Sequence, residues 1–167
     1  RTGKILNRDL LTVMDSQIRS SELESLPYEQ VREFGIIGIS PPIIRMKTQL
    51  RRIREGNIPV LITGESGTGK ELAARSFSQE SKPFVAINCR AVATTLMSSL
   101  LFGHAKGAFT GAVQDSGGLV AQADGGVLFL DEVGDLPLDV QPLLYRFLDD
   151  GSFYRVGENV ERFANVR

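Results

Sequence analysis

Residues 59–70, which read PVLITGESGTGK, decide the fold of this chain. The first five, 59–63, are almost wholly apolar and predict a short buried strand. The next seven, 64–70, have the Gly-x4-Gly-Lys spacing of a phosphate-binding loop, and a helix is expected over about 69–79. Glycines allow backbone N–H groups to surround a phosphate, the helix N-terminus favours negative charge, and Lys70 reaches the β- and γ-phosphates. The stretch therefore predicts a nucleotide-binding α/β protein.

Further elements alternate along the chain in the same way. Apolar runs predict strands at 84–87 and 127–130, a helix is expected over 138–148, and 165–167 reads as the beginning of another strand. A helix that opens at Pro41-Pro42 precedes them. Strands that alternate with helices predict a parallel sheet with helices on both faces, which is a three-layer α/β core.

Residues 1–33 form a polar, charged lead-in, and the main domain is expected over 34–167. Four apolar residues of the lead-in share one helical face: Leu10, Leu11, Met14 and Ile18. A linker helix and a dimerising helix from an upstream regulatory domain both fit this pattern. The chain begins without Met, so we expect it to be part of a longer protein.

Composition excludes several classes of protein. The 167 residues carry 19 basic and 20 acidic side chains, for a net charge of −1, which argues against a dedicated nucleic-acid module. No apolar run approaches the length that spans a bilayer, so no membrane contact is expected. The single cysteine excludes an internal disulfide and suits a reducing cytoplasm.

Two carboxylates follow the strand at 127–130. The carboxyl ends of strands in a parallel sheet form the ligand-binding edge, so Asp131 and Glu132 are expected beside the phosphate loop. Asp131 is suited to organise Mg²⁺, and Glu132 to orient or deprotonate the attacking water. Glu71 occupies the position after Lys70 where a Ser or Thr usually holds Mg²⁺, and a carboxylate also suits this ion. These residues predict hydrolysis of ATP.

Residues 102–112, FGHAKGAFTGA, form a loop of small residues with one aromatic at its tip. Two interpretations are open from the residues alone. An exposed Phe109 beside Thr110 indicates a contact surface, whereas a buried Phe109 closes an ordinary turn. His104 is interpreted as a loop-anchoring residue, because one histidine without a cysteine partner makes no metal site.

The segment 107–112, GAFTGA, resembles the loop of that name in bacterial sigma-54-dependent activators, the enhancer-binding branch of AAA+ ATPases. The phosphate loop with its following residue, GESGTGKE at 64–71, is that family's form of the motif. The resemblance extends from about Gly38 to the end of the chain. Further matches are Phe84 to Cys89, Ala123 to Glu132, and the run that begins at Arg155.

The resemblance implies hexameric rings with ATP between subunits, in which hydrolysis moves the GAFTGA loop against sigma-54 and remodels the closed promoter complex. It implies that Asn88 pairs with the catalytic Glu132 and switches it with nucleotide state. The implied nucleotide-binding residues are Gly64, Glu65, Ser66, Gly67, Thr68, Gly69, Lys70 and Glu71, with Ile37 and Gly38 along the adenine. The implied sigma-54 contacts are Gly107, Ala108, Phe109, Thr110, Gly111 and Ala112, of which Phe109 and Thr110 touch the factor.

The chain departs from the family pattern at four positions. Leu100 and Ala121 stand where carboxylates are usual, Val120 replaces a Phe, and Pro142 replaces a Lys in a helix. We expect Pro142 to be tolerated only within the first helical turn. The two lost carboxylates weaken the expected link between nucleotide and loop, so an assembly module that binds nucleotide without remodelling is the alternative function.

The resemblance also implies segments beyond this chain. The polar sensor, the arginine fingers and the helical lid lie past residue 167, and DNA is bound only through a domain absent here. Arginine fingers stabilise the transition state of phosphoryl transfer, so weak ATPase activity is expected of the 167 residues alone. The resemblance places the protein in the bacterial cytoplasm.

Overall fold

The computed structural model describes residues 33–38 and 40–167, which separate into two compact units. One unit ends at Ser76 and the other is Phe77–Arg167, and each is described by itself. The expected lead-in helix with Leu10 and Ile18 lies outside the described residues. Within the described ranges no helix is long and apolar enough to span a bilayer.

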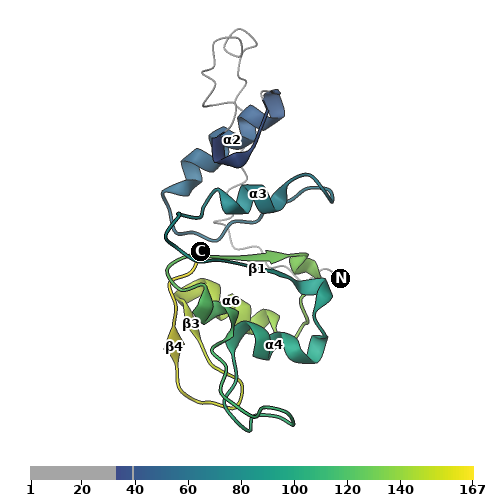
Figure 1. Ribbon diagram of the computed structural model, residues 1–167, viewed down its shortest axis with the longest axis vertical. Helices are drawn as coiled ribbons and strands as arrows, with labels where there is room; N and C mark the ends of the chain where they lie inside the picture. The colour runs from purple at the N-terminus through teal and green to yellow at the C-terminus, as the bar shows by residue number, and fades with distance from the viewer. Residues whose placement is uncertain (1–32, 39) are drawn as a thin grey trace. The chain divides into compact units, whose positions relative to one another are not determined.

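The first unit contains the short 3-10 helix η2 (Glu33–Gly35), the helix α2 (Pro41–Arg54) and the helix α3 (Lys70–Arg75) (Figure 1). The expected helix at Pro41-Pro42 is confirmed, because both prolines occupy the first positions, where a missing N–H costs nothing. Arg51 of α2 forms a forked ion pair with Glu33 of η2, with Nε 2.6 Å from Oε1. This pair fastens η2 to α2.

Two expectations in the first unit differ from the structure. Residues 59–63 form no strand, because a strand requires a hydrogen-bonded neighbour and the described residues give this segment none. The helix after the phosphate loop ends at Arg75, not near residue 79. The hydroxyl of Ser76 donates to the carbonyl of Ala73 at 2.6 Å, which satisfies a terminal carbonyl of α3 and ends the helix.

The second unit is built on a parallel pair of strands, β1 (Phe84–Asn88) and β2 (Val127–Asp131), so both predicted strands are confirmed. Their register pairs Phe84 with Val127 and Asn88 with Asp131. The end of the chain continues this pattern beside β2. Arg167 donates its N–H to Gly126 at 3.0 Å and accepts from Leu128 at 2.9 Å, which is the hydrogen-bond pattern of a parallel neighbour.

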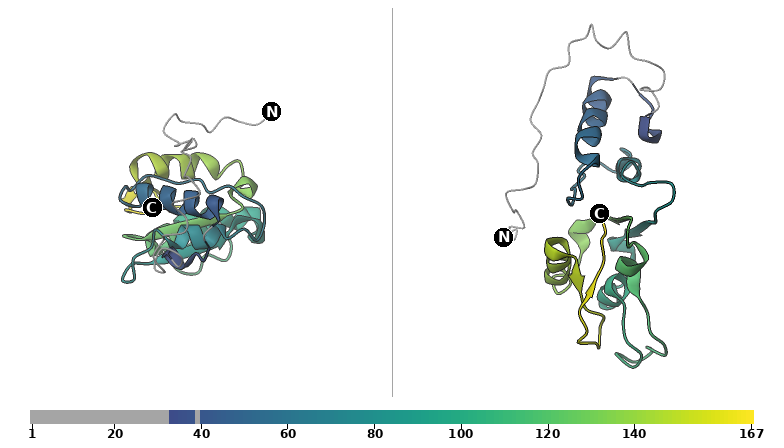
Figure 2. Two further views of the ribbon diagram at one scale, coloured as in Figure 1. Left: turned by 90° about the horizontal axis from the view of Figure 1, so that it is seen from above. Right: turned by 90° about the vertical axis from the view of Figure 1, so that its left-hand side faces the viewer.

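Helices α4 (Thr94–Phe102), α5 (Gly118–Gln122) and α6 (Gln141–Asp150) complete the unit with the antiparallel pair β3 (Ser152–Phe153) and β4 (Arg162–Phe163). Short 3-10 helices follow the two parallel strands, η3 (Cys89–Ala91) and η4 (Val133–Asp135). Helices α4 and α6 lie on one side of the sheet (Figures 1 and 2). This arrangement is the predicted parallel α/β class.

The core of the second unit joins that side of the sheet to the helices. Its most completely buried side chains come from α4, α5 and the start of α6: Met97, Leu101, Phe102, Val120 and Val140. The rings of Phe102, Phe147 and Phe153 pack together with centroids 6.1–6.5 Å apart. The helix expected over 138–148 is α6, which begins at Gln141, so Pro142 lies in its first turn and meets the condition for being tolerated.

Candidate nucleotide and loop sites

The phosphate loop closes over the side chain of Lys70. The Lys70 ammonium donates to the carbonyls of Gly64 and Glu65, each at 3.1 Å. The Thr68 hydroxyl donates to the same Glu65 carbonyl at 2.8 Å. The loop therefore holds the Lys70 ammonium at its centre, where this charge can bind an anion.

The backbone of this loop depends on glycine. Gly67 has a φ of 79° and Gly69 a φ of 91°, both in the left-handed region that side chains disfavour. A Cβ on Gly64 would lie 2.8 Å from the Thr68 hydroxyl oxygen. Gly69 is also the N-cap of α3 and gives it no side-chain cap, so the first N–H groups of the helix stay available. The loop therefore fits a phosphate.

Three other candidate residues lie in the first unit. Glu71 forms a forked ion pair with Arg75, at 3.0 Å to Nε and 2.7 Å to Nη2. The Glu71 carboxylate is thus paired with the Arg75 guanidinium. Its binding to Mg²⁺ stays a prediction. Ile37 is 63% exposed, and the Gly38 carbonyl accepts from the ammonium of the buried Lys47 at 3.0 Å.

The carboxyl ends of β1 and β2 bring Asn88 and Asp131 together. The Asn88 amide donates to the Asp131 carboxylate at 3.3 Å, and the Asn88 carbonyl oxygen accepts from the backbone of Arg90 at 3.0 Å. The amide therefore pairs with Asp131, whereas the resemblance implied a pairing with Glu132. The pairing with Glu132 stays a prediction for another nucleotide state.

Glu132 follows β2 in a strained conformation, with φ 51° and ψ 45°. A non-glycine residue in the left-handed region costs on the order of 1–3 kcal/mol, and such residues cluster at functional sites. Its side chain is exposed, and neither Glu132 nor Asp131 has a salt bridge within the described ranges. Both carboxylates are therefore free to act on a cation or a water.

The donor set fits magnesium held mainly by nucleotide. The described part of the chain contains no group of three or more His, Cys, Asp and Glu side chains that suits a metal. Mg²⁺ in nucleotide sites usually takes one or two carboxylates and completes its shell with phosphates and water. The single carboxylate of Asp131 matches that requirement.

Cys89 lies directly after Asn88 and is 2% exposed. Burial raises the pKa of its thiol, and the negative charges of Asp131 and Asp135 raise it further. A thiol held in its neutral form is unreactive. The interpretation of Cys89 as a small buried hydrophobic residue is therefore confirmed.

Loop 104–116, which contains the GAFTGA segment, is a closed, hydrogen-bonded projection. His104 and Ser116 exchange two backbone hydrogen bonds at its base, of 3.0 and 2.8 Å. Higher up, Gly107 donates to Ala112 at 2.8 Å, and the backbone of Lys106 donates to the carboxylate of Asp115 at 2.7 Å. These bonds fix the stem and leave the tip to the solvent.

The side chain of Phe109 at the tip is partly exposed and packs against one neighbouring ring. It is 38% exposed, against 77% for Val113 on the same loop. Its ring packs edge-on against that of His104, with centroids 5.0 Å apart. The Nδ1 atom of His104 lies 2.7 Å from the Ser99 hydroxyl of α4, so His104 anchors the loop as predicted. Thr110 is exposed beside Phe109.

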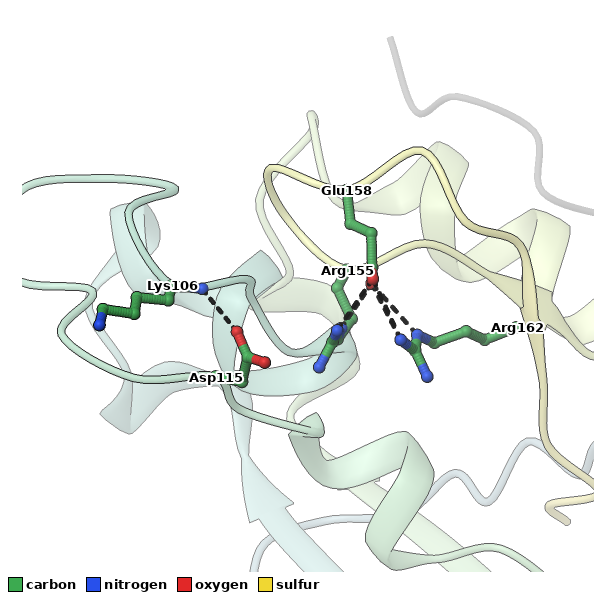
Figure 3. A network of polar contacts seen from close by, with 5 residues as sticks. All are labelled: Lys106, Asp115, Arg155, Glu158 and Arg162. Carbon is green, nitrogen blue, oxygen red and sulfur yellow. Dashed lines mark hydrogen bonds and ion pairs between the residues drawn. The ribbon is translucent and has the colours of Figure 1, made fainter.

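A second loop, residues 154–161 between β3 and β4, packs beside loop 104–116 (Figures 1 and 3). Ala105 donates to the Val156 carbonyl, and Val156 donates to the Gly103 carbonyl, both at 2.9 Å. A Cβ on Gly157 would lie 2.6 Å from the Cβ of Ala108. The two loops are therefore joined through backbone contacts.

The second loop is held by one carboxylate between two arginines (Figure 3). Glu158 accepts from Arg155 at 2.6 and 2.9 Å and from Arg162 at 3.1 and 3.2 Å. Hydrogen bonds from Arg155 and then Arg162 lower the pKa of Glu158 from 4.5 to about 2. The sequence prediction missed this cluster. The local sequence indicates it only through spacing, because Glu158 lies three residues after Arg155 and four before Arg162.

The predicted site residues thus form three groups. The first unit holds the phosphate loop, Ile37 and Gly38. The second unit holds the pair Asn88 and Asp131 with the adjacent Glu132, and the GAFTGA loop. The structure joins Asn88 to Asp131 by a hydrogen bond and closes the phosphate loop around Lys70.

Comparisons with known proteins identify the family of this chain. The family model described as the sigma-54 interaction domain matches residues 36–167. The Nif-specific regulatory protein of Azotobacter vinelandii is 43% identical over 168 residues, which cover 96% of this chain and 32% of that protein. The alginate biosynthesis regulator AlgB of Pseudomonas aeruginosa is 44% identical over 153 residues, which cover 89% of this chain and 34% of that protein.

Solved structures of NtrX from Brucella abortus have a similar fold. Its complex with ATP superposes with a TM-score of 0.69 at 33% identity, over 79% of this chain and 29% of that one. Its complex with ADP gives a TM-score of 0.70 at 32% identity, over 89% of this chain and 32% of that one. The chain spans about a third of the length of these relatives. The predicted AAA+ class of α/β fold is thereby confirmed, and the chain belongs to the family of sigma-54 interaction domains.

Proposed function

We propose that this chain is the part of a sigma-54 activator that binds and hydrolyses ATP and uses the energy to move the GAFTGA loop against sigma-54. One observation carries the proposal. A phosphate loop closed over Lys70 and a projecting loop with half-exposed Phe109 occur in one chain of this family. NtrX, a relative by fold, has been solved with ATP bound.

In this proposal the residues of each unit that act on the nucleotide have distinct tasks. The N–H groups of 64–69 and of the first turn of α3 bind phosphate oxygens, and the Lys70 ammonium exchanges its two loop carbonyls for them. Asp131 supplies the protein carboxylate toward Mg²⁺, which neutralises phosphate charge when bound. Glu132 holds the attacking water and accepts its proton.

Asn88 links this chemistry to nucleotide state in the proposal. Its amide rests on Asp131 in the structure. Exchange of that partner for Glu132 would withdraw the carboxylate from the water. The two carboxylates are adjacent in sequence, and the proposed exchange moves the Asn88 amide from Asp131 to Glu132.

The GAFTGA loop supplies the contact with sigma-54. Phe109 and Thr110 lie at its tip, where a ring and a hydroxyl are both accessible. The stem is fixed by backbone bonds, so a displacement of the second loop is transmitted to the tip. Assembly into a hexameric ring belongs to the same proposal.

The test uses the full-length protein, trapped with ADP and a metal fluoride, and asks whether it retains purified sigma-54. Retention that depends on the trap and is lost in Thr110→Ala is the expected result. Nucleotide binding without retention would contradict remodelling and favour the alternative, a nucleotide-binding assembly module. Leu100 and Ala121, which are both exposed and uncharged, would then be the positions to change.

A further inference from the structure

His104 is held from three directions. Its backbone exchanges two hydrogen bonds with Ser116 and forms a parallel bridge to Val156 of the second loop. Its Nδ1 atom lies 2.7 Å from the hydroxyl of Ser99, which comes from the middle of α4. Main chain and side chain are thus both fixed, so the imidazole ring has a single defined orientation.

Phe109 rests on that ring. The centroids are 5.0 Å apart at an interplanar angle of 64°, the edge-to-face arrangement that aromatic pairs prefer. Phe109 is 38% exposed although it lies at the tip of a projecting loop, whereas Val113 is 77% exposed. The imidazole therefore shelters part of a ring that the loop alone would leave in water.

We propose that His104 is a positioning residue for sigma-54 recognition: a platform, oriented by Ser99, on which the ring of Phe109 is held ready for the factor. This inference rests on the proposed function and adds to it the residue that presents the contact. A side chain fixed before binding loses less conformational entropy when it binds. The platform therefore raises affinity for sigma-54 without touching the factor or the nucleotide.

The first experiment tests the geometry without sigma-54. 4-Fluorophenylalanine replaces Phe109, and the ¹⁹F resonance is measured in the chain itself. We expect His104→Ala to move the resonance towards that of the free amino acid, because the neighbouring ring is lost. Ser99→Ala is expected to move it in the same direction by a smaller amount. Ser98→Ala on the same helix is the matched control and should leave it in place. An unchanged resonance in His104→Ala would overturn the proposal.

The second experiment measures affinity for sigma-54 in the trapped full-length protein, together with the ATPase rate. We expect His104→Ala to weaken binding about two- to tenfold, the worth of one aromatic pair, at an unchanged ATPase rate. His104→Phe keeps an aromatic ring but loses the bond to Ser99, so it should restore only part of the affinity. Equal affinity of the parent and of His104→Ala would overturn the platform. Absence of binding by the parent would instead refute the proposed function and leave the ¹⁹F result to decide the geometry.

Both variants are first compared with the parent by thermal melting. If His104→Ala fails to fold, Ser99→Ala decides the question, because it releases the imidazole and leaves every backbone bond of the loop in place. A Ser99→Ala protein with the parent's resonance and the parent's affinity would then overturn the proposal.

Discussion

Asn88 and Asp131 face each other across the ends of two parallel strands, and the amide of Asn88 donates to the carboxylate of Asp131 at 3.3 Å. The contact neutralises no charge, so Asp131 stays available to a cation. It also fixes which oxygen of the carboxylate is turned towards the neighbouring strand. One hydrogen bond thus orients the single carboxylate that the proposed magnesium site requires.

Asp131→Asn tests that requirement. The substitution keeps the shape and removes the charge, so nucleotide binding without Mg²⁺ should be unchanged. The factor by which Mg²⁺ increases the affinity for the nucleotide should fall by about tenfold or more. Interactions with a charged group are worth about 1.5–3 kcal/mol. Titration with a fluorescent ATP analogue, with and without Mg²⁺, measures both. Asp135→Asn, on the exposed helix η4 nearby, is the control, and an equal loss there would contradict the assignment.

Lys70→Ala tests the phosphate loop. Among the described residues the ammonium bonds to two loop carbonyls alone, so the free energy of unfolding should change little. ATP affinity should fall about ten- to a hundredfold, because a charge-assisted bond to phosphate is lost. Calorimetric titration of the 167-residue chain measures the change. Lys82→Ala removes an exposed lysine outside the loop, and binding indistinguishable between the two variants would refute the site.

The sequence predicted the elements whose cause is local. The strands expected at 84–87 and 127–130 follow from apolar runs and are present as β1 and β2. The helix expected from residue 138 begins at Gln141, which places Pro142 in its first turn. The strand expected at 59–63 was wrong because strand formation depends on a partner that the run itself does not specify.

Contacts between distant residues were beyond the same reasoning. Asn88 and Asp131 are 43 residues apart, so their hydrogen bond depends on the register of the sheet. The motif identified Phe109 as a candidate contact, but neither spacing nor composition indicated that His104 shelters its ring. The position of Glu158 between two arginines likewise appears only when the second loop is folded.

Glu158→Gln should alter the acid stability of the second unit. The folded pKa of Glu158, about 2, is below its ordinary value of 4.5, so its contribution to stability is present above 4.5 and is lost as the pH falls towards 2. The parent should therefore melt at a higher temperature than Glu158→Gln at pH 7. The difference should shrink between pH 4.5 and 2.

The control for this prediction is Glu161→Gln. Glu161 pairs with Arg146 on the surface, where both side chains are 42% exposed, and such pairs contribute little. Its difference from the parent should be small at every pH. A Glu158→Gln curve that stays parallel to the parent down to pH 2 would show that the two arginines do not stabilise the folded carboxylate.

Gly157→Ala should disturb the junction of the two loops. Gly157 has a φ of 78°, and an added Cβ would lie 2.6 Å from the Cβ of Ala108, which the backbone of the GAFTGA loop holds in place. The left-handed conformation costs about 1–2 kcal/mol, and overpacking adds about 1–3 kcal/mol. Gly125→Ala is the matched control. Gly125 has a φ of 76°, and no atom of the described residues lies within 4 Å of the added Cβ, so this variant should show the conformational cost alone. Urea unfolding of both variants measures the two costs. An equal loss of stability in Gly157→Ala and Gly125→Ala would mean that the loops move apart at little cost to accommodate the added Cβ. The second loop would then be unable to transmit a displacement to Phe109.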